Sequence, residues 1–200
     1  MAQRRRASEV RQAELTDAAL HIIATKGIAA LTTRALAAEV GLTSGAIFRH
    51  FASLDALLDA LVDRVEQVVE ATYPAEQLAP AERLERFVEA RSTAVGKQLG
   101  ILRLVLSEQF LLALPQESSR RLGACVRKTR RFVRTCLEQA QAEGSVRSDL
   151  PAAALSPIVI GTIRSLALSH KRGAERGAEA KAVRETLMAL LSGHTSRATS

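Results

Sequence analysis

The chain has few aromatic residues and few residues that bend or cross-link a backbone. Among its 200 residues there is no tryptophan, one tyrosine, two cysteines and five prolines. So few cysteines exclude a disulfide-rich scaffold, and so few prolines and glycines exclude a collagen-like or low-complexity chain. Alternating apolar and polar runs typical of strands are also lacking. Apolar residues recur at helical spacing almost throughout, which predicts an all-α fold.

Long apolar runs are missing as well. The best candidate for a membrane span, GILRLVLSEQFLLAL from Gly100, contains Arg103 and Glu108, whereas a span needs about 20 apolar residues. The first residues, MAQRRRASEVRQAE, are basic but have no apolar segment behind them, unlike a secretory signal. We therefore expect a cytoplasmic protein without a membrane partner.

The sequence also lacks the residue spacings of catalytic and metal sites. The four histidines are scattered, and no phosphate-cradling glycine loop or nucleophile elbow occurs. Cys125 and Cys136 are expected on one helix, about 16 Å apart along its axis, too far for a disulfide. We expect free thiols in a core, no metal, no cofactor and no enzymatic activity.

Charge is unevenly distributed along the chain, whose net charge is +7. Residues 1–51 contain 7 basic and 4 acidic side chains, residues 52–119 contain 6 and 11, and residues 120–200 contain 15 and 6. An acidic middle between two basic ends indicates different roles for different parts. The total charge alone does not establish nucleic-acid binding.

Helical spacing, caps and breakers predict about nine helices. The second and third are short and lie within Thr32–Phe51, and the fourth begins after a cap at Ser53 and ends before Pro74. "RGAERG" is expected to be a flexible connection, and Pro157 to bend its helix or set its start. The other expected helices are Ser8–Lys26, Ala81–Gln98, Ile101–Leu114, Gln116–Glu143, Pro151–Lys171 and Ala178–Leu191.

The stretch TTRALAAEVGLTSGAIFRHF, Thr32–Phe51, has the spacing of a helix-turn-helix. Counted from Thr33, small Ala37 is fifth, where two steeply crossing helices bring their backbones together. Gly41 is ninth, where the turn needs a positive φ. Ile47 is fifteenth and belongs to a small core with four other apolar side chains of the stretch. These four are Leu36, Val40, Leu42 and Phe51.

The second short helix would expose small, polar and basic side chains suited to the DNA major groove. These are Ser44, Gly45, Ala46, Arg49 and His50. Arg49 is the only long donor among them, so we expect it to contact guanine. The alternative is a helical hairpin that only packs, with Arg49 and His50 solvated.

These residues, within TTRALAAEVGLTSGAIFRHFASLDALL and after AALHIIATKGIAAL, resemble the N-terminal domain of TetR-family transcriptional regulators over about residues 10–62. The resemblance implies that Thr33 and Thr43 contact backbone phosphates, that Ser44, Gly45 and Ala46 contact base edges or sugars, and that His50 contacts a phosphate. It also implies a dimer, built as a four-helix bundle from the last two helices of each chain. From the residues alone, an intramolecular core for these two helices is an equal interpretation.

The sequence departs from the family pattern at two positions of the expected DNA-binding surface. Phe48 stands where the family usually has tyrosine, and Leu54 stands where it usually has lysine. Two phosphate contacts are therefore expected to be missing, and each loss weakens binding to all sequences alike. The arm Arg4-Arg5-Arg6 either compensates by reaching a minor groove or backbone, or is a solvated extension.

The middle helices are expected to enclose a pocket for a small, largely apolar effector. Core packing uses the same residue types, so each of these residues either lines the pocket or only packs in the core. The expected apolar lining is Phe87, Leu99, Leu102, Leu106, Phe110, Phe132 and Val133, with Ser107, Gln109 and Thr129 as polar anchors.

Two basic features stand beside these residues. Arg164 interrupts the apolar run IVIGTIRSLAL and is a further candidate contact of the effector. It either pairs with a carboxylate or an anionic group of the ligand, or escapes to the surface or dimer rim. The segment from Arg120 to Arg134 has seven basic residues and no acid. It is expected to be a solvated helix face, or else a surface for an anionic partner, either nucleic acid or the acidic middle of the chain.

Together these features predict a helix-turn-helix DNA-binding domain with a basic arm at 1–52, a helical ligand-binding and dimerisation domain at 53–194, and a frayed tail at 195–200. The expected function is a dimeric repressor that an effector releases from a palindromic double-stranded DNA operator. The alternative is a DNA-associated structural, cell-division or nucleoid factor without an inducer.

Overall fold

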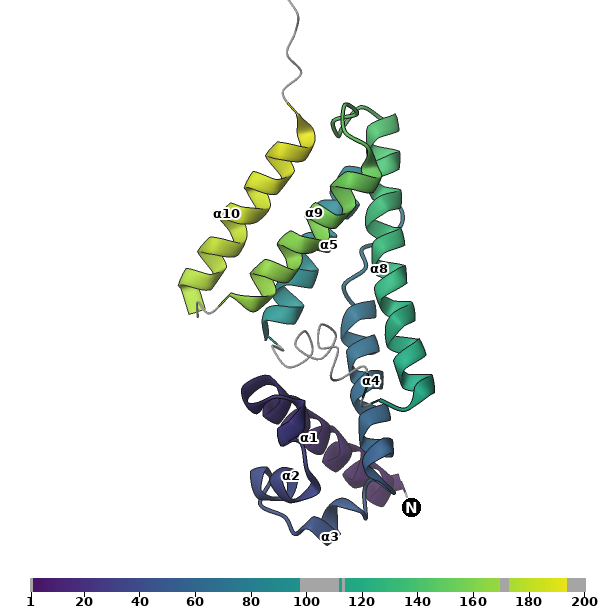
Figure 1. Cartoon of the computed structure of the whole chain (residues 1–200), viewed down its shortest axis with the longest axis vertical. Coiled ribbons are helices and arrows are strands. Elements are labelled where there is room, and N and C mark those ends of the chain that lie inside the picture. The colour runs from purple at the N-terminus through teal and green to yellow at the C-terminus, as the bar shows by residue number, and fades with distance from the viewer. Residues whose placement is uncertain (1, 98–111, 113, 170–172, 194–200) are drawn as a thin grey trace, which may run out of the picture. The chain divides into compact units, whose positions relative to one another are not determined.

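The computed structural model describes residues 2–97, 112, 114–169 and 173–193, and within them all side chains except those of residues 2–7, 24, 94–97, 167 and 168. This part of the chain contains eight α-helices, one 3-10 helix and no strand, which confirms the all-α fold (Figure 1). The elements are α1 (Ala2–Lys26), η1 (Ile28–Ala30), α2 (Thr33–Glu39), α3 (Ser44–Ile47), α4 (Leu54–Glu70), α5 (Pro80–Lys97), α8 (Gln116–Ala142), α9 (Ala152–Leu168) and α10 (Gly173–Ser192).

The chain folds into two compact units. The first consists of Met1–Glu70 and Gln98–Cys125, and the second of Ala71–Lys97 and Val126–Ser200. In the first unit α1 packs against η1, α2 and α4, and α2 packs against α3. These helices pack through the apolar faces that the helical spacing predicts. The buried residues of these helices include Leu15, Ala19, Ile22, Leu36, Ile47, Phe51, Leu57, Leu58, Leu61 and Val65.

The start of α8 is tied to α4 within the first unit. Arg121 forms ion pairs with Asp63 and Glu66 on α4, and Ser118 donates a hydrogen bond to Asp59. These bonds to two carboxylates raise the pKa of Arg121 above its already high normal value. Arg121, one residue of the basic stretch, therefore meets part of the acidic middle of the chain.

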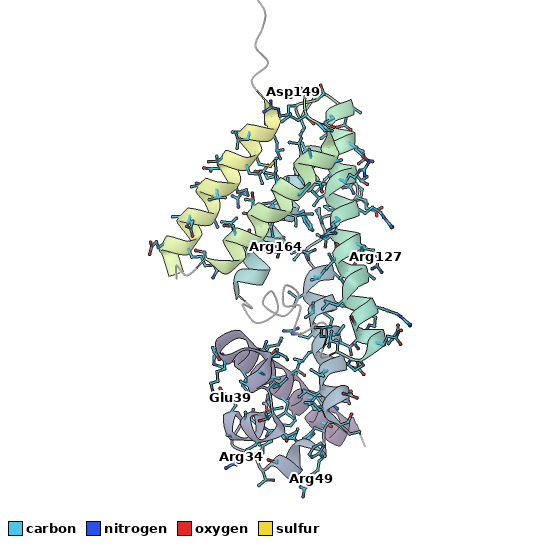
Figure 2. The ribbon with its side chains drawn as sticks, in the orientation of Figure 1. Arg34, Glu39, Arg49, Arg127, Asp149 and Arg164 are labelled. Atoms are coloured by element: carbon cyan, nitrogen blue, oxygen red, sulfur yellow. The ribbon has the colours of Figure 1, made fainter. Side chains whose placement is uncertain are left out.

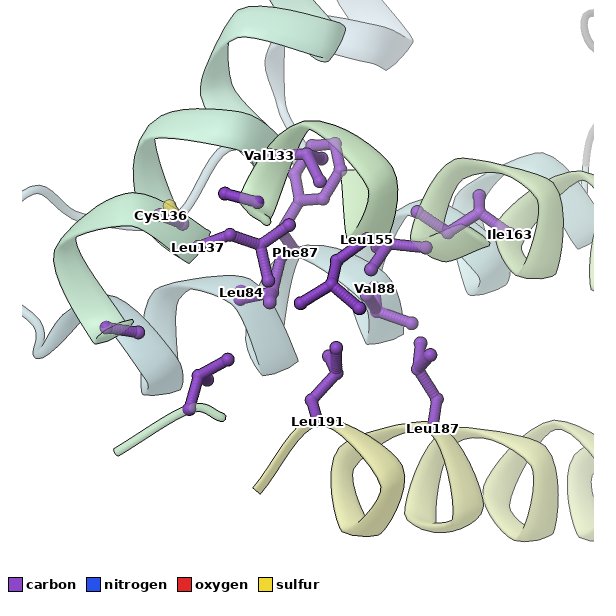
Figure 3. Packing of buried hydrophobic residues seen from close by; sticks show 14 residues of the cluster. Leu84, Phe87, Val88, Val133, Cys136, Leu137, Leu155, Ile163, Leu187 and Leu191 are labelled. Carbon is purple, nitrogen blue, oxygen red and sulfur yellow. The ribbon is translucent and has the colours of Figure 1, made fainter. Parts of the chain in front are cut away.

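The second unit surrounds a separate apolar core to which α5, α8, α9 and α10 contribute (Figure 3). Phe87 of α5 is fully buried in it, and α10 contributes Leu187 and Leu191, which point towards Leu84 and Val88 (Figure 3). Burying one such side chain contributes about 1.5–3 kcal/mol. This core stabilises the second unit.

Two helix starts differ from the sequence-based expectation. α1 begins at Ala2 rather than at about Ser8, and α10 begins at Gly173 rather than at Ala178, so Gly173–Gly177 of the expected connection belongs to a helix. The start of α10 is held by tertiary bonds that no sequence period reveals: Arg176 Nη2 donates to the carbonyl oxygen of Leu166, and Ser169 donates to Glu179.

α9 continues through Pro157, which lies inside the helix and is exposed. A proline there removes one backbone hydrogen bond, but the buried residues around it, Leu155 and Val159, keep the helix on the core. The ninth expected helix, Ile101–Leu114, lies almost wholly outside the described residues. In the described part of the chain, no helix combines the length and apolar character that crossing a bilayer requires.

Candidate nucleic-acid interface

The turn between α2 and α3 has the geometry that the spacing predicts. Gly41 has a φ of 67°, in the left-handed region, and the amide of Leu42 donates to the carbonyl oxygen of Ala37 at 2.8 Å. Ala37 is buried where the two helices approach. A β-carbon at Gly41 would meet nothing within 4 Å, so there is room for a side chain. Glycine is needed here because the positive φ is strained for other residues.

Threonine side chains cap both short helices. Thr32 Oγ1 accepts a hydrogen bond from the amide of Ala35 at 3.1 Å, and Thr43 Oγ1 accepts one from the amide of Ala46 at 3.3 Å. Such caps satisfy amides that a helix of this length cannot pair internally. Ser53 caps α4 in the same way, through the amide of Ala56 at 3.1 Å, as expected.

The regular part of α3 is short, as expected, since it covers only Ser44–Ile47. Backbone hydrogen bonds then continue the turn, from the amide of His50 to the carbonyl oxygen of Ile47 at 2.9 Å and from that of Phe51 to the same oxygen at 3.0 Å. The segment gains its stability from packing, because Ile47 and Phe51 are buried. Of the expected small core, Leu36 is also buried, whereas Val40 and Leu42 are half-buried.

The exposed surface of this segment contains the side chains expected to meet DNA. Ser44, Gly45 and Arg49 are exposed, whereas Ala46 and His50 are half-buried. Figure 2 shows Arg49, and Arg34 of α2, at the same end of the first unit. Because Arg34 is also exposed, a second cation lies on the helix that precedes the turn.

One contact that sequence reasoning missed supports this surface. Gln12 Nε2 on α1 donates to the carbonyl oxygen of His50 at 2.7 Å, so α1 holds the end of the α3 segment. The sequence did indicate that Gln12 faces the core of the unit, because it lies three residues before Leu15 and continues the buried face of α1. The His50 Nδ1 atom is buried and has no hydrogen-bond partner among the described residues.

The two departures from the family pattern lie on the surface. The side chains of Phe48 and Leu54 are 50% and 40% exposed. Large apolar side chains this exposed contribute little to the core of the unit. Thr33 is half-buried at the first position of α2, and Thr43 is exposed. Arg4, Arg5 and Arg6 lie within α1, but their side chains are outside those that the structure describes.

Residues 15–61 match the family model described as "Bacterial regulatory proteins, tetR family". Over these residues the chain is a TetR-type N-terminal domain. The matched residues contain the second half of α1, all of α2 and α3 with the turn at Gly41, and the start of α4. The chain is therefore a DNA-binding transcriptional regulator. No curated protein matches the chain.

Several solved structures share the fold of this chain. The ketosteroid transcriptional regulator KstR2 of Mycobacterium tuberculosis superposes with a TM-score of 0.82 and 21% identity, over 92% of this chain and 95% of that one. PfmR from Thermus thermophilus has a TM-score of 0.75 and 20% identity, over 90% and 95%. AibR, solved in complex with isovaleryl coenzyme A and operator DNA, has a TM-score of 0.75 and 17% identity, over 91% and 98%.

Three of the residues expected to contact an effector lie together in the second unit. Phe87 and Phe132 stack with ring centroids 4.8 Å apart, and Thr129 shares a hydrogen bond of 3.1 Å with the hydroxyl of Tyr73. Phe87 is fully buried and Phe132 half-buried, which fits core packing as well as ligand contact. Leu99, Leu102, Leu106, Ser107, Gln109 and Phe110 lie outside the described residues.

Sequence reasoning missed two residues of this aromatic cluster. Tyr73, the only tyrosine, lies 5.4 Å from Phe87 and 5.1 Å from Phe132 between ring centroids. The guanidinium of Arg91 lies over the rings of Phe87 and Tyr73, at 4.8 and 5.3 Å. The spacing of Phe87 and Arg91, four residues apart on α5, was the available signal for Arg91.

Arg164 does not join the aromatic cluster. Its side chain is exposed on α9 (Figure 2), which agrees with escape from the apolar run. The expected basic face of α8 is exposed too, at Arg120, Arg127, Arg130, Arg131 and Arg134, while Leu122, Val133 and Cys136 on the opposite side are buried. Neither Cys125 nor Cys136 forms a disulfide with a described residue. Among the described side chains, no three His, Cys, Asp or Glu residues gather as a metal site would require.

Proposed function

We propose that this TetR-family chain is a dimeric, cytoplasmic repressor that a small, largely apolar molecule releases from a palindromic operator. The observation that carries the proposal is the capped α2–turn–α3 segment, which keeps Ser44, Gly45 and Arg49 exposed within the residues that match the family. In this proposal Arg49 contacts guanine, while Thr33, Thr43 and His50 contact backbone phosphates.

Dimerisation through α9 and α10 is supported by apolar side chains on faces away from the core. Leu187 and Leu191 of α10 are buried, yet Leu190 between them is 61% exposed. On α9, Val159 is buried, yet Ile158 is 57% exposed. A second copy of the chain would cover Leu190 and Ile158 and place two α3 segments about 34–36 Å apart, one helical turn of DNA.

The proposed effector region is the aromatic cluster of Tyr73, Phe87 and Phe132, with Thr129 as a polar anchor. That AibR was solved with both isovaleryl coenzyme A and operator DNA supports a small-molecule response in a chain of this fold. The effector must bind better to a conformation whose α3 segments are wrongly spaced for the operator. Moving the population from 1:99 to 99:1 takes about 5.5 kcal/mol of differential affinity.

Footprinting on the promoter beside the protein's own gene tests the proposal. We expect a protected inverted repeat, and Arg49→Ala should weaken it by about 1–3 kcal/mol. Arg86→Ala is the matched control, because Arg86 is exposed on α5 in the second unit. Protection that is unaffected by Arg49→Ala would overturn the role of Arg49. Many dispersed sites that no metabolite pool releases would favour a structural nucleoid factor instead.

A further inference from the structure

A groove in the second unit is lined by four arginines from two helices. It has a volume of about 600 Å³ between α8 and α9, a size typical of small-molecule sites. α8 contributes Arg130, Arg131 and Arg134, and α9 contributes Arg164. The rest of the lining comes from one face of α9 and is small or apolar: Ala153, Ser156, Pro157, Ile160 and Gly161.

The positive charge in this groove is mostly uncompensated. Arg134 Nε pairs with Glu138 at 2.7 Å, one turn away on the same helix. Arg130, Arg131 and Arg164 have no acidic partner among the described side chains. Like charges gathered in one groove repel one another, so an anion that enters it relieves this repulsion as well as gaining its own contacts.

The arrangement fits phosphate better than other anions. A guanidinium presents a planar fork of donors that pairs two-to-two with phosphate oxygens. A single carboxylate brings one negative charge, whereas one phosphate monoester brings about −1.5 to −2 near neutral pH. Three unpaired guanidiniums therefore match a ligand with two linked phosphates. Pro157 and Ile160 add an apolar wall for an organic part of the ligand.

We propose that the α8–α9 groove is a binding site for an organic diphosphate or polyphosphate. Arg130, Arg131 and Arg164 hold its phosphates, and the α9 wall contacts its organic part. The site goes beyond the proposed function, because it uses none of the side chains of the helix-turn-helix or of the aromatic cluster.

Isothermal titration of the full-length protein with ADP and with inorganic pyrophosphate tests the site. Both probes should bind, with ADP tighter if its organic part reaches the α9 wall. Arg164→Gln and Arg130→Gln should each weaken binding about tenfold or more, as loss of a charge-assisted contact does. Arg164→Lys should lose less than Arg164→Gln, because it keeps the charge but not the planar fork.

Arg127→Gln is the matched control, since Arg127 is an exposed arginine of α8 (Figure 2) that does not line the groove. It removes the same charge and should leave the affinity for both probes within about twofold. Equal losses for Arg127→Gln and Arg164→Gln would mean that only the general charge of α8 attracts the probes, which would overturn the proposal.

Other occupants of the groove predict other results. Absence of binding by both probes at millimolar concentration would overturn the proposal. If Arg164→Gln then weakened binding to duplexes of any sequence, the groove would be a nucleic-acid contact. If it instead changed the sedimentation of the protein from dimer to monomer, the groove would be part of an interface between copies.

Discussion

At the scale of single residues, Leu54 opens α4 with a side chain that is 40% exposed, where the family pattern has lysine. We expect Leu54→Lys to strengthen operator binding and to steepen the dependence of log K on log salt by about 0.9, the value for one added phosphate contact. The new cation lies at a helix N-terminus, where the helix dipole disfavours positive charge, so the free energy of unfolding should fall by about 0.3–1 kcal/mol. Fluorescence anisotropy over a salt series measures both effects on binding.

The control for Leu54→Lys is Leu150→Lys. Leu150 is also 40% exposed but lies in the second unit, in the connection between α8 and α9. Leu150→Lys adds the same charge, so an equal change in slope for both variants would show that net charge, not a contact at the start of α4, is responsible.

The two cysteines differ in their surroundings. Cys136 is buried, and the loss of hydration raises the pKa of its thiol, whereas Cys125 is half-buried. Because the thiolate is the reactive form, we expect iodoacetamide at pH 8 to modify Cys125 well before Cys136. Mass spectrometry of timed samples gives the order. In guanidinium chloride the two thiols should react alike, and faster modification of Cys136 in the folded protein would contradict its burial.

At the scale of elements, the turn between α2 and α3 depends on one backbone conformation. Gly41→Ala introduces no clash, since nothing lies within 4 Å of the added β-carbon, but it imposes a left-handed φ on alanine. That should lower the free energy of unfolding by about 1–2 kcal/mol. Gly45 of α3 is the matched position, with the same free space but no positive φ. At position 45 alanine should raise the free energy of unfolding by up to about 1 kcal/mol. Urea unfolding of both variants measures the two changes, which should have opposite signs.

The helix-turn-helix could be predicted because its constraints are local in sequence. Ala37, Gly41 and Ile47 lie within fifteen residues and each has one structural role. The start of α10 could not be predicted from the sequence. It depends on hydrogen bonds between Arg176 and Leu166 and between Ser169 and Glu179, which form only when α9 and α10 pack together. Helical spacing carries no information about such tertiary contacts.

At the scale of the whole molecule, the difference between local and tertiary constraints also applies to the two candidate ligand regions, the aromatic cluster and the α8–α9 groove. Phe87 and Phe132 were recognisable as apolar residues of expected helices, but their stacking with Tyr73 joins three separate parts of the chain. Arg164 was conspicuous in its apolar run, but its neighbours in the groove, Arg130 and Arg131, are supplied by another helix. Sequence patterns show which residues are unusual, whereas packing determines which of them share a site.

The last prediction concerns the assembly of two chains. We expect Leu190→Glu to convert a dimer to a monomer, because it would bury a charge without a partner in the proposed α9–α10 interface. Leu190 is 61% exposed in the single chain, so the change should cost the fold itself little. Sedimentation velocity should show half the mass, and operator binding should fall while binding to a single half-site remains. Leu150→Glu, outside both helices, should stay dimeric. A monomeric unmodified protein, or a dimeric Leu190→Glu variant, would refute this interface.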